Sequence, residues 1–390
     1  MDTRERLLAT LNFEPLDRPL CWEFGYWYPT LVRWYQEGLP RHVGIDEHSD
    51  DDATVFGEAL GIDWRNPSRE YDAHHTLGFD EYMYRIPINN LFCPVFESRL
   101  LEDHADWYKV SDQDGQIVKI SKHNGSRHFV DTCVKNRDDY GRVKAERLRP
   151  NLKDRLPGGW EEIKTKLKHR TFPLMYGGMQ GFFNQSRRLL GFERLMLAFG
   201  TDPELIKAIA DDTAELLIAL YDPLLAELPG DYAMISEDMA YKNGCFVSPA
   251  TFREFFMPAY KKLTGFYRDH GIRHIIVDCD GDVMGLIPLL IEGGVTGLHP
   301  FEVTGRNDIV EVRRRYPRFQ ILGGIGKKIV AQGTAAIDVE LARLVPPLKA
   351  TGGWIPFIDH TVPPEVSWPN FCYYRKRLLE LWHDSPSANT

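Results

Sequence analysis

Short apolar runs alternate along the chain with longer segments in which apolar residues recur at helical spacing. The runs are typical of buried strands, and the spacing is typical of amphipathic helices. Eight runs predict strands near residues 20, 88, 174, 234, 276, 297, 321 and 356. From the third run on, a helical segment follows each strand, which indicates parallel strands joined by right-handed crossovers. The pattern therefore predicts an α/β fold of the (β/α)₈ TIM-barrel type.

Residues 98–150 depart from this alternation. They are rich in charged residues, and the turn signals Asp114-Gly115 and Asn124-Gly125 separate short β-prone pieces. Such a pattern favours a small antiparallel hairpin insertion. Earlier in the chain, Glu47–Asp63 predicts a polar segment that leads into a helix. We expect one barrel domain over residues 1–384, including the insertion, and a disordered tail over residues 385–390.

One stretch concentrates acidic residues between two predicted strands. Arg273–Asp278 reads as a strand that ends in three aspartates around one thiol, in the order Asp278-Cys279-Asp280-Gly281-Asp282. A helix is predicted over Val283–Glu292, and the next strand, Val295–Leu298, leads to Glu302. Because active sites of α/β barrels lie at the carboxyl ends of the strands, these acids are candidates for a site.

Polar residues gather at the same end of the other predicted strands. They are Glu23, Asn89 or Asn90, Gln180, Glu237 with Asp238, Glu302, Lys327, and Asp359 with His360. Loops are polar in any protein, and Asp278 and Asp282 fit equally well as caps of the helix near Val283. The concentration of acids after the fourth, fifth, sixth and eighth strands nevertheless predicts an active site.

Composition argues against several classes of protein, including nucleic-acid-binding and membrane-spanning proteins. The 390 residues carry a formal net charge of −9 and no long basic run, which argues against a nucleic-acid partner. No apolar run approaches the ~18 residues that a membrane span needs. Six scattered cysteines without a CxxC pair are typical of a reduced, cytoplasmic protein. Neither GxxxxGKS nor GxGxxG occurs, so we expect no nucleotide and no NAD.

Several segments resemble the uroporphyrinogen decarboxylase superfamily. They are RERLLATLNFEPLDRP (Arg4–Pro19), LLGFERL (Leu189–Leu195), SEDMAYKNGCFVSPATFREFFMPAYKK (Ser236–Lys262), VDCDGD (Val277–Asp282), GGI…GT (Gly323–Thr334) and DHTVPPE (Asp359–Glu365). The resemblance covers nearly the whole chain apart from the hairpin region, and it implies a (β/α)₈ barrel. It also implies one of two chemistries: cofactor-free decarboxylation of porphyrinogens, or methyl transfer with corrinoid carrier proteins, usually with zinc.

The sequence departs from both branches of that superfamily. The decarboxylases carry two arginines after the first strand, where this chain has Trp22 and Tyr26, and an aspartate after the second, where it has Asn89-Asn90. Without charge-assisted contacts, each worth about 1.5–3 kcal/mol, uroporphyrinogen is a poor substrate for this chain. The methyltransferase branch often has a His-x-Cys pair after the fifth strand, where this chain has Asp278-Cys279-Asp280.

The resemblance and the acid cluster together favour a methyltransferase. We expect it to move a methyl group between a small methylated compound, such as an aryl methyl ether, and a corrinoid carrier protein. Zinc accepts carboxylate and imidazole ligands, and Asp280, Glu302 and His360 are the expected set. The expected catalytic residues are His360, Asp280, Glu237 and Asp238. The expected substrate-binding residues are Trp22, Glu23, Tyr26, Asn89, Asn90, Gln180 and Lys327.

Two alternatives remain open at this stage. The first is a decarboxylase or other carbon–carbon lyase that acts on a substrate other than uroporphyrinogen, with His360 as general acid and no metal. The second is a binding or catalytically altered homologue, since a fold does not fix a function. A homodimer is common in the families that the sequence resembles.

Overall fold

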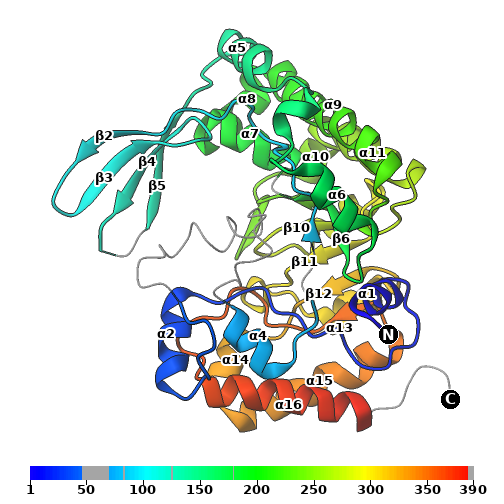
Figure 1. The fold of residues 1–390 in the computed structure, drawn as a ribbon. Helices are drawn as coiled ribbons and strands as arrows, with labels where there is room; N and C mark the ends of the chain where they lie inside the picture. The colour runs from blue at the N-terminus through cyan, green and yellow to red at the C-terminus, as the bar shows by residue number, and fades with distance from the viewer. Residues whose placement is uncertain (46–69, 82–83, 124–125, 179, 385–390) are drawn as a thin grey trace.

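The computed structural model describes residues 1–45, 70–81, 84–123, 126–178 and 180–384 (Figure 1). Three predictions lie outside these residues, in whole or in part. They are the helix within Glu47–Asp63, the Asn124-Gly125 turn and the tail over residues 385–390. The organisation of residues 1–384 as a single domain stays a prediction.

A curled parallel sheet of seven strands forms the centre of the molecule, in the order β1-β6-β7-β10-β11-β12-β13. Every ladder within it is parallel, which confirms the predicted α/β barrel class. The strands are β1 (Tyr84–Arg85), β6 (Leu174–Gly178), β7 (Tyr232–Ser236), β10 (Ile275–Asp278), β11 (Gly297–His299), β12 (Gln320–Leu322) and β13 (Trp354–Ile355).

The first two predicted strands differ from the structure. The segment Leu20–Phe24 joins no ladder among the residues that the structure describes, and the amide of Cys21 donates to the carboxylate of Asp80 at 2.8 Å and not to a neighbouring strand. The second strand lies earlier than residue 88, at Tyr84–Arg85. The amide of Ile86 still donates to the carbonyl of Met175 at 2.9 Å, and Pro87, which has no N–H to donate, then ends the pairing.

Leu20 and Trp22 still occupy the place of a first strand. They are buried with residues of the sheet's concave side, among them Met175, Ile276 and Leu322. Helix α1 (Thr3–Leu11) adds two leucines to this inner cluster. The cluster is filled with side chains, as in the core of a closed barrel.

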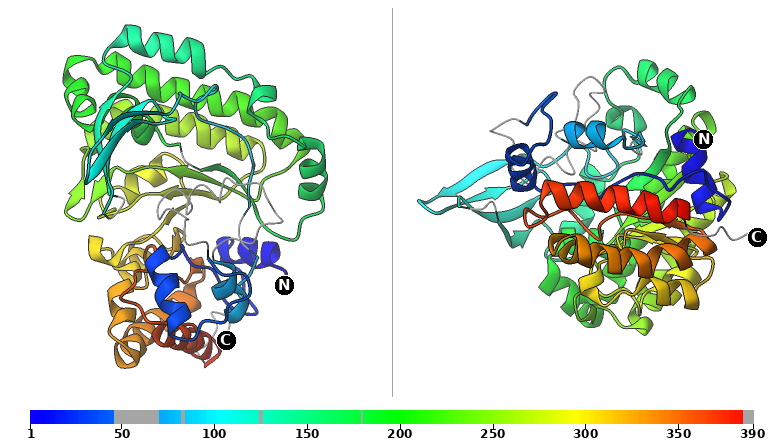
Figure 2. Two further views of the ribbon diagram at one scale, coloured as in Figure 1. Left: turned by 60° about the vertical axis from the view of Figure 1, so that its left-hand side comes forward. Right: turned by 90° about the horizontal axis from the view of Figure 1, so that it is seen from below.

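Helices cover the outer face of the sheet (Figures 1 and 2). They are α2 (Tyr28–Gln36), α4 (Tyr71–Leu77), α6 (Trp160–Lys168), α7 (Phe182–Leu190), α8 (Phe192–Thr201), α9 (Pro203–Glu227), α10 (Pro249–Phe255), α11 (Met257–Asp269), α12 (Ile287–Glu292), α13 (Ile309–Arg315), α14 (Lys327–Ala331), α15 (Thr334–Thr351) and α16 (Trp368–Asp384). None in the described part of the chain is both long and apolar enough to cross a membrane. Helix α12 begins at Ile287, later than the predicted Val283, so neither Asp278 nor Asp282 caps it.

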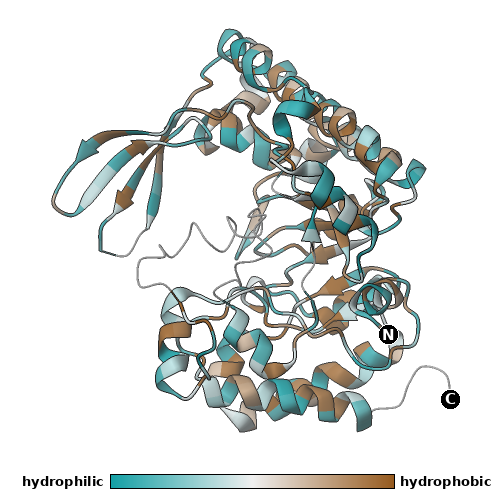
Figure 3. Cartoon of the chain, viewed as in Figure 1, coloured by the Kyte–Doolittle hydropathy of each residue, from teal (hydrophilic) through white to brown (hydrophobic). Residues whose placement is uncertain are grey.

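The predicted hairpin insertion is present as a separate antiparallel sheet, in the order β2-β3-β4-β5. Its strands are β2 (Arg99–Asp103), β3 (Trp107–Ser111), β4 (Gln116–Ser121) and β5 (Arg127–Thr132), and α5 (Arg137–Arg147) follows. Gly115, at φ +73°, makes the predicted turn between β3 and β4. The sheet stands out from the barrel and carries hydrophilic and hydrophobic residues together (Figures 1 and 3).

Candidate active site

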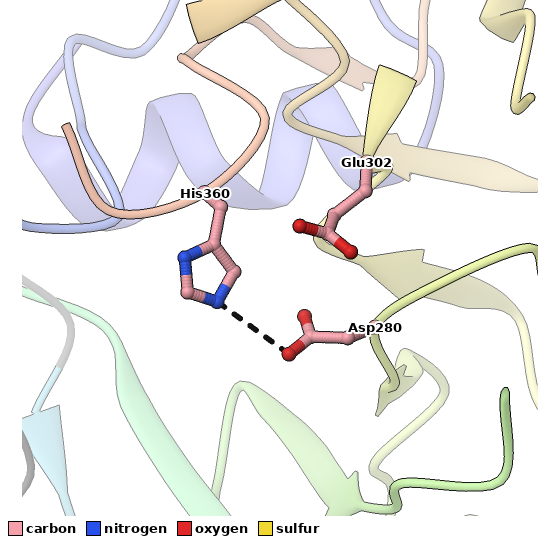
Figure 4. Close-up of side chains that lie close together, drawn as sticks. All are labelled: Asp280, Glu302 and His360. Atoms are coloured by element: carbon pink, nitrogen blue, oxygen red, sulfur yellow. Dashed lines mark ion pairs between the residues drawn. The ribbon is translucent and has the colours of Figure 1, made fainter. Parts of the chain in front are cut away.

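Three side chains converge at the carboxyl ends of the central strands. Asp280 follows β10, Glu302 follows β11 and His360 follows β13. One ligand atom from each lies within 4.8 Å of the others. Figure 4 shows the imidazole of His360 facing the two carboxylates. The structure thus brings together the three residues predicted as metal ligands.

Glycine and asparagine shape the loops that carry the two acids. Gly281 has φ +86°, and a Cβ there would lie 2.6 Å from the backbone of Tyr241, so only glycine fits. The Gly281 amide donates to the Glu302 carboxylate at 3.0 Å. Asn307 donates to the carbonyls of Gly281 and Glu302 at 2.7 and 2.8 Å. The two acids are therefore held in a fixed relation to each other.

His360 and Asp280 form an ion pair, with 3.5 Å between Nε2 and Oδ2. Burial alone would lower the pKa of His360, but the hydrogen bond and charge of Asp280 outweigh it and the pKa is raised. Burial would likewise raise the pKa of Asp280, but His360, His299 and Lys327 together lower it. The pair therefore favours an imidazolium beside a carboxylate when no metal is bound.

Phe24 orients the imidazole from its other side. Its ring stacks on His360 with centroids 4.5 Å apart and on His299 with centroids 5.1 Å apart. His299 in turn lies 3.6 Å from Asp278, which accepts a hydrogen bond from Ser236 at 2.8 Å. The rings of Phe24 and His299 thus form one wall of the site.

The ammonium of Lys327 lies between Glu302 and the fully buried carboxylate of Asp359. It lies 3.2 Å from Glu302 and 4.0 Å from Asp359. Asp359 accepts the amides of Val303 and Lys327 at 2.9 and 3.0 Å, so it fixes the loop after Glu302 and the start of α14. Burial raises the pKa of Asp359, and the charge of Lys327 opposes this effect.

The donor set fits a divalent metal ion such as zinc. Two carboxylates and one imidazole are ligands that zinc accepts, and three protein ligands leave a coordination position for substrate or water. The site also has three carboxylates (Asp280, Glu302 and Asp359) against the single ammonium of Lys327, and this excess of negative charge favours a cation.

Glu237 and Asp238, the other predicted catalytic acids, lie outside this cluster. Glu237 is buried and accepts the amides of Phe182 and Asn184 at 2.6 and 2.9 Å, so it caps α7. Burial raises its pKa to about 7. Asp238 pairs with Arg187 at the cluster's edge, where burial and the charge of Asp280 raise its pKa. A catalytic role for either acid stays a prediction.

Trp22, Glu23 and Tyr26, predicted to bind substrate, are all buried. Trp22 lies in the inner cluster of the barrel, and Tyr26 packs edge-to-face on Trp34. The Glu23 carboxylate accepts hydrogen bonds from Arg375 at 3.1 Å and from the amide of Ile358 at 2.9 Å. Through these contacts the three residues stabilise the fold. Their role in substrate binding stays a prediction.

The remaining predicted substrate-binding residues divide between two places. Lys327 lies in the cluster, as described. Asn90 donates to the hydroxyl of Tyr221 at 2.7 Å, and Gln180 donates to the carbonyl of Asn90. Asn89 accepts the amide of Leu91 at 3.0 Å, and both asparagines line a cavity beside β1.

Two residues near the cluster carried weak sequence signals. Phe24 closes an apolar run, and nothing in its local pattern indicates contact with a histidine 336 positions later. In the sequence Asp359 is only one polar residue at the end of a strand, although its buried carboxylate holds two loops. Both contacts are long-range, which explains why periodicity did not reveal them.

The sequence matches a known protein family, and a solved structure shares the fold. Residues 118–375 match the sequence model of the uroporphyrinogen decarboxylase family. A methyltransferase from Methanosarcina mazei has a similar structure, with a TM-score of 0.57 over 98% of this chain and 99% of that one, at 15% identity. A B12-independent methionine synthase from a Shewanella species scores 0.36 over 72% of this chain and 74% of that one, at 11% identity. No curated protein matches the sequence.

Proposed function

The chain belongs to the uroporphyrinogen decarboxylase family, and we propose that it is a metal-dependent methyltransferase. In this proposal a methyl group moves between a small methylated compound, such as an aryl methyl ether, and a corrinoid on a separate carrier protein. The observation that carries the proposal is the convergence of Asp280, Glu302 and His360 within 4.8 Å. The shared fold of the Methanosarcina mazei methyltransferase supports it.

Asp280, Glu302 and His360 would hold the metal. The chemistry that zinc would supply there is Lewis acidity toward an ether oxygen, which would leave with the electron pair of the broken bond. The reduced corrinoid of the carrier protein would take the methyl group, and the departing oxygen would take a proton from solvent. Phe24 keeps the imidazole in one orientation, and Lys327 and Asp359 keep Glu302 in place. Such supporting contacts commonly affect metal affinity 10- to 100-fold.

Metal content tests the proposal directly. We expect zinc near one equivalent in the protein purified without a metal-binding tag, and loss of zinc in Asp280→Asn and His360→Gln. Asp211→Asn is the matched control, because Asp211 lies exposed on α9, pairs with Lys262 and should leave the zinc in place. Methylation of free reduced cobalamin by an aryl methyl ether, followed by absorbance, should require the metal. A protein that binds no zinc when zinc is offered would refute the proposal.

A second candidate is a decarboxylase or other carbon–carbon lyase on a substrate other than uroporphyrinogen. The ion pair between His360 and Asp280 favours it, since this pair places a proton donor at the site without a metal. His360 would protonate the carbon that loses CO₂. Release of CO₂ from a candidate acid that survives chelation and fails in His360→Gln would support the lyase over the methyltransferase.

A further inference from the structure

A cavity of about 700 Å³ lies beside β1, and its lining includes none of Asp280, Glu302 and His360. The loop after β1, the turn between β3 and β4, and the 3-10 helix η1 (Leu152–Arg155) surround it. One part of its wall is apolar, with Ile88, Leu91, Phe92 and Leu156. Its size is that of a site for a small organic ligand.

Four arginines line the same cavity, and three of them have partners. Arg127 pairs with Asp112 at 3.4 Å, and Arg188 pairs with Asp114 at 3.0 Å. Arg155 donates to backbone carbonyls, including that of Leu91 at 2.8 Å. Each of these three guanidinium groups therefore has a partner within the protein.

Arg85 is the fourth arginine, and its guanidinium has no partner among the described residues. Its guanidinium makes no hydrogen bond or ion pair with any residue that the structure describes, and its Nη2 atom is buried. Burial lowers its pKa. A buried charge without a partner costs free energy, which an anion would recover.

The backbone makes room for this guanidinium. Gly178 at the end of β6 has φ +110°, and a Cβ there would lie 2.7 Å from Arg85 Nη1. Only glycine accepts both the backbone conformation and the close approach. The position of Arg85 at the wall of the cavity thus depends on a residue choice in the neighbouring strand.

We propose that this cavity binds a small organic monocarboxylate with an apolar body, whose carboxylate pairs with Arg85. The carboxylate matches a planar guanidinium, and the apolar wall matches the body. Asp112, Asp114 and Asp154 also line the cavity, and their charges oppose a multiply charged anion such as phosphate. The carboxylate is either a substrate or an effector of the enzyme.

Calorimetric titration of the full chain tests the site with 3-phenylpropanoate and its uncharged amide. We expect the acid to bind at least tenfold more tightly than the amide, which corresponds to about 1.4 kcal/mol. Arg85→Met should abolish this preference, and Arg85→Lys should keep part of it. Arg314→Met is the matched control, since Arg314 is exposed and paired with Glu311. Equal affinity for acid and amide, or a preference that survives Arg85→Met, would overturn the proposal.

Thermal unfolding of the unmodified protein gives a second measurement that needs no variant. The acid should raise the melting temperature and the amide should not, because only the acid pairs with the buried charge. Without ligand, Arg85→Met should melt no lower than the parent. A melting temperature that the acid leaves unchanged at millimolar concentration would also overturn the proposal.

Two further experiments distinguish whether the bound carboxylate is a substrate or an effector. Methyl transfer from 3-(4-methoxyphenyl)propanoate to reduced cobalamin that fails in Arg85→Met identifies a substrate. A changed rate of transfer from an uncharged donor when 3-phenylpropanoate is added identifies an effector. Binding itself is independent of the proposed function, because Asp280→Asn removes the metal site and should leave the affinity of the acid unchanged.

Discussion

Glu237 is a buried acid with four protein donors, from three amides and the hydroxyl of Tyr260. Burial outweighs these donors and raises its pKa to about 7, above the 4.5 of an unshifted glutamate. The folded state thus holds a proton that the unfolded chain releases at lower pH. The contribution of Glu237 to stability is complete below pH 4.5 and is lost as the pH rises through 7.

We therefore predict a pH-dependent difference between the parent protein and Glu237→Gln. On raising the pH from 5 to 8, the free energy of unfolding of the parent should fall relative to the variant, by up to about 3 kcal/mol. Urea unfolding at the two pH values measures this difference. A parallel response of both proteins would show that Glu237 is ionised in the folded state throughout.

At the scale of single residues, the sequence identified three side chains that the structure brings together, but it could not tell which other acids are buried in structural hydrogen-bond networks. Asp280, Glu302 and His360 follow three strands of one sheet, so their convergence was predictable from parallel topology. Glu237 follows β7 and Glu23 ends the first predicted strand, yet both carboxylates lie in buried hydrogen-bond networks. Their partners lie 352 and 55 positions away, and no local pattern reports such contacts.

At the scale of elements, one ion pair links the start of the barrel to helix α16. The carboxylate of Glu23 and the guanidinium of Arg375 are both buried, with 3.1 Å between them. Tyr374, the neighbour of Arg375 on α16, donates to the same carboxylate at 3.0 Å. This contact holds the segment Leu20–Phe24 in place, which pairs with no strand in the described part of the chain.

We predict that Arg375→Met destabilises the protein by about 3–5 kcal/mol, because it leaves the carboxylate of Glu23 buried without its cation. The double variant Glu23→Gln with Arg375→Met should recover part of that loss, since both charges are then gone. Chemical unfolding of the three proteins measures the effect. If the double variant is no more stable than Arg375→Met, the loss comes from packing on α16 and not from the charge.

Element boundaries were less predictable than element types. From β6 onward the strands and helices follow the predicted alternation, since each strand is an apolar run bounded by turn residues. The early strands differ because single residues override the pattern. Pro87 ends β1, and the Asp80 carboxylate takes the amide of Cys21 that a ladder would have used.

For the whole molecule, the N-terminal helix completes the inner core of the barrel. Leu7 and Leu11 of α1 are 1% and 2% exposed and pack in the inner cluster. Gln320 from β12 donates to the carbonyl of Leu11 at 2.8 Å, which ties the helix to the sheet. The barrel core therefore depends on a helix that lies outside the strand–helix repeat.

We predict that Leu11→Ala costs about 2–5 kcal/mol of stability, the range for a leucine deleted from a packed core. Leu8→Ala, on the same helix but only half-buried, is the control and should cost clearly less. Differential scanning calorimetry of both variants gives the comparison. Equal losses would indicate that α1 contributes through its helical structure and not through the barrel core.

The long reach between Glu23 and Arg375 also sets an order of events during translation. Glu23 is made 352 residues before its cation, and Asp280 and Glu302 are made before His360. A nascent chain grows from its N-terminus, so it carries both acids of the cluster while the imidazole is still missing. A chain that ends before residue 360 would therefore carry Asp280 and Glu302, two of the three proposed metal ligands, and would lack both the imidazole and the cation that pairs with Glu23.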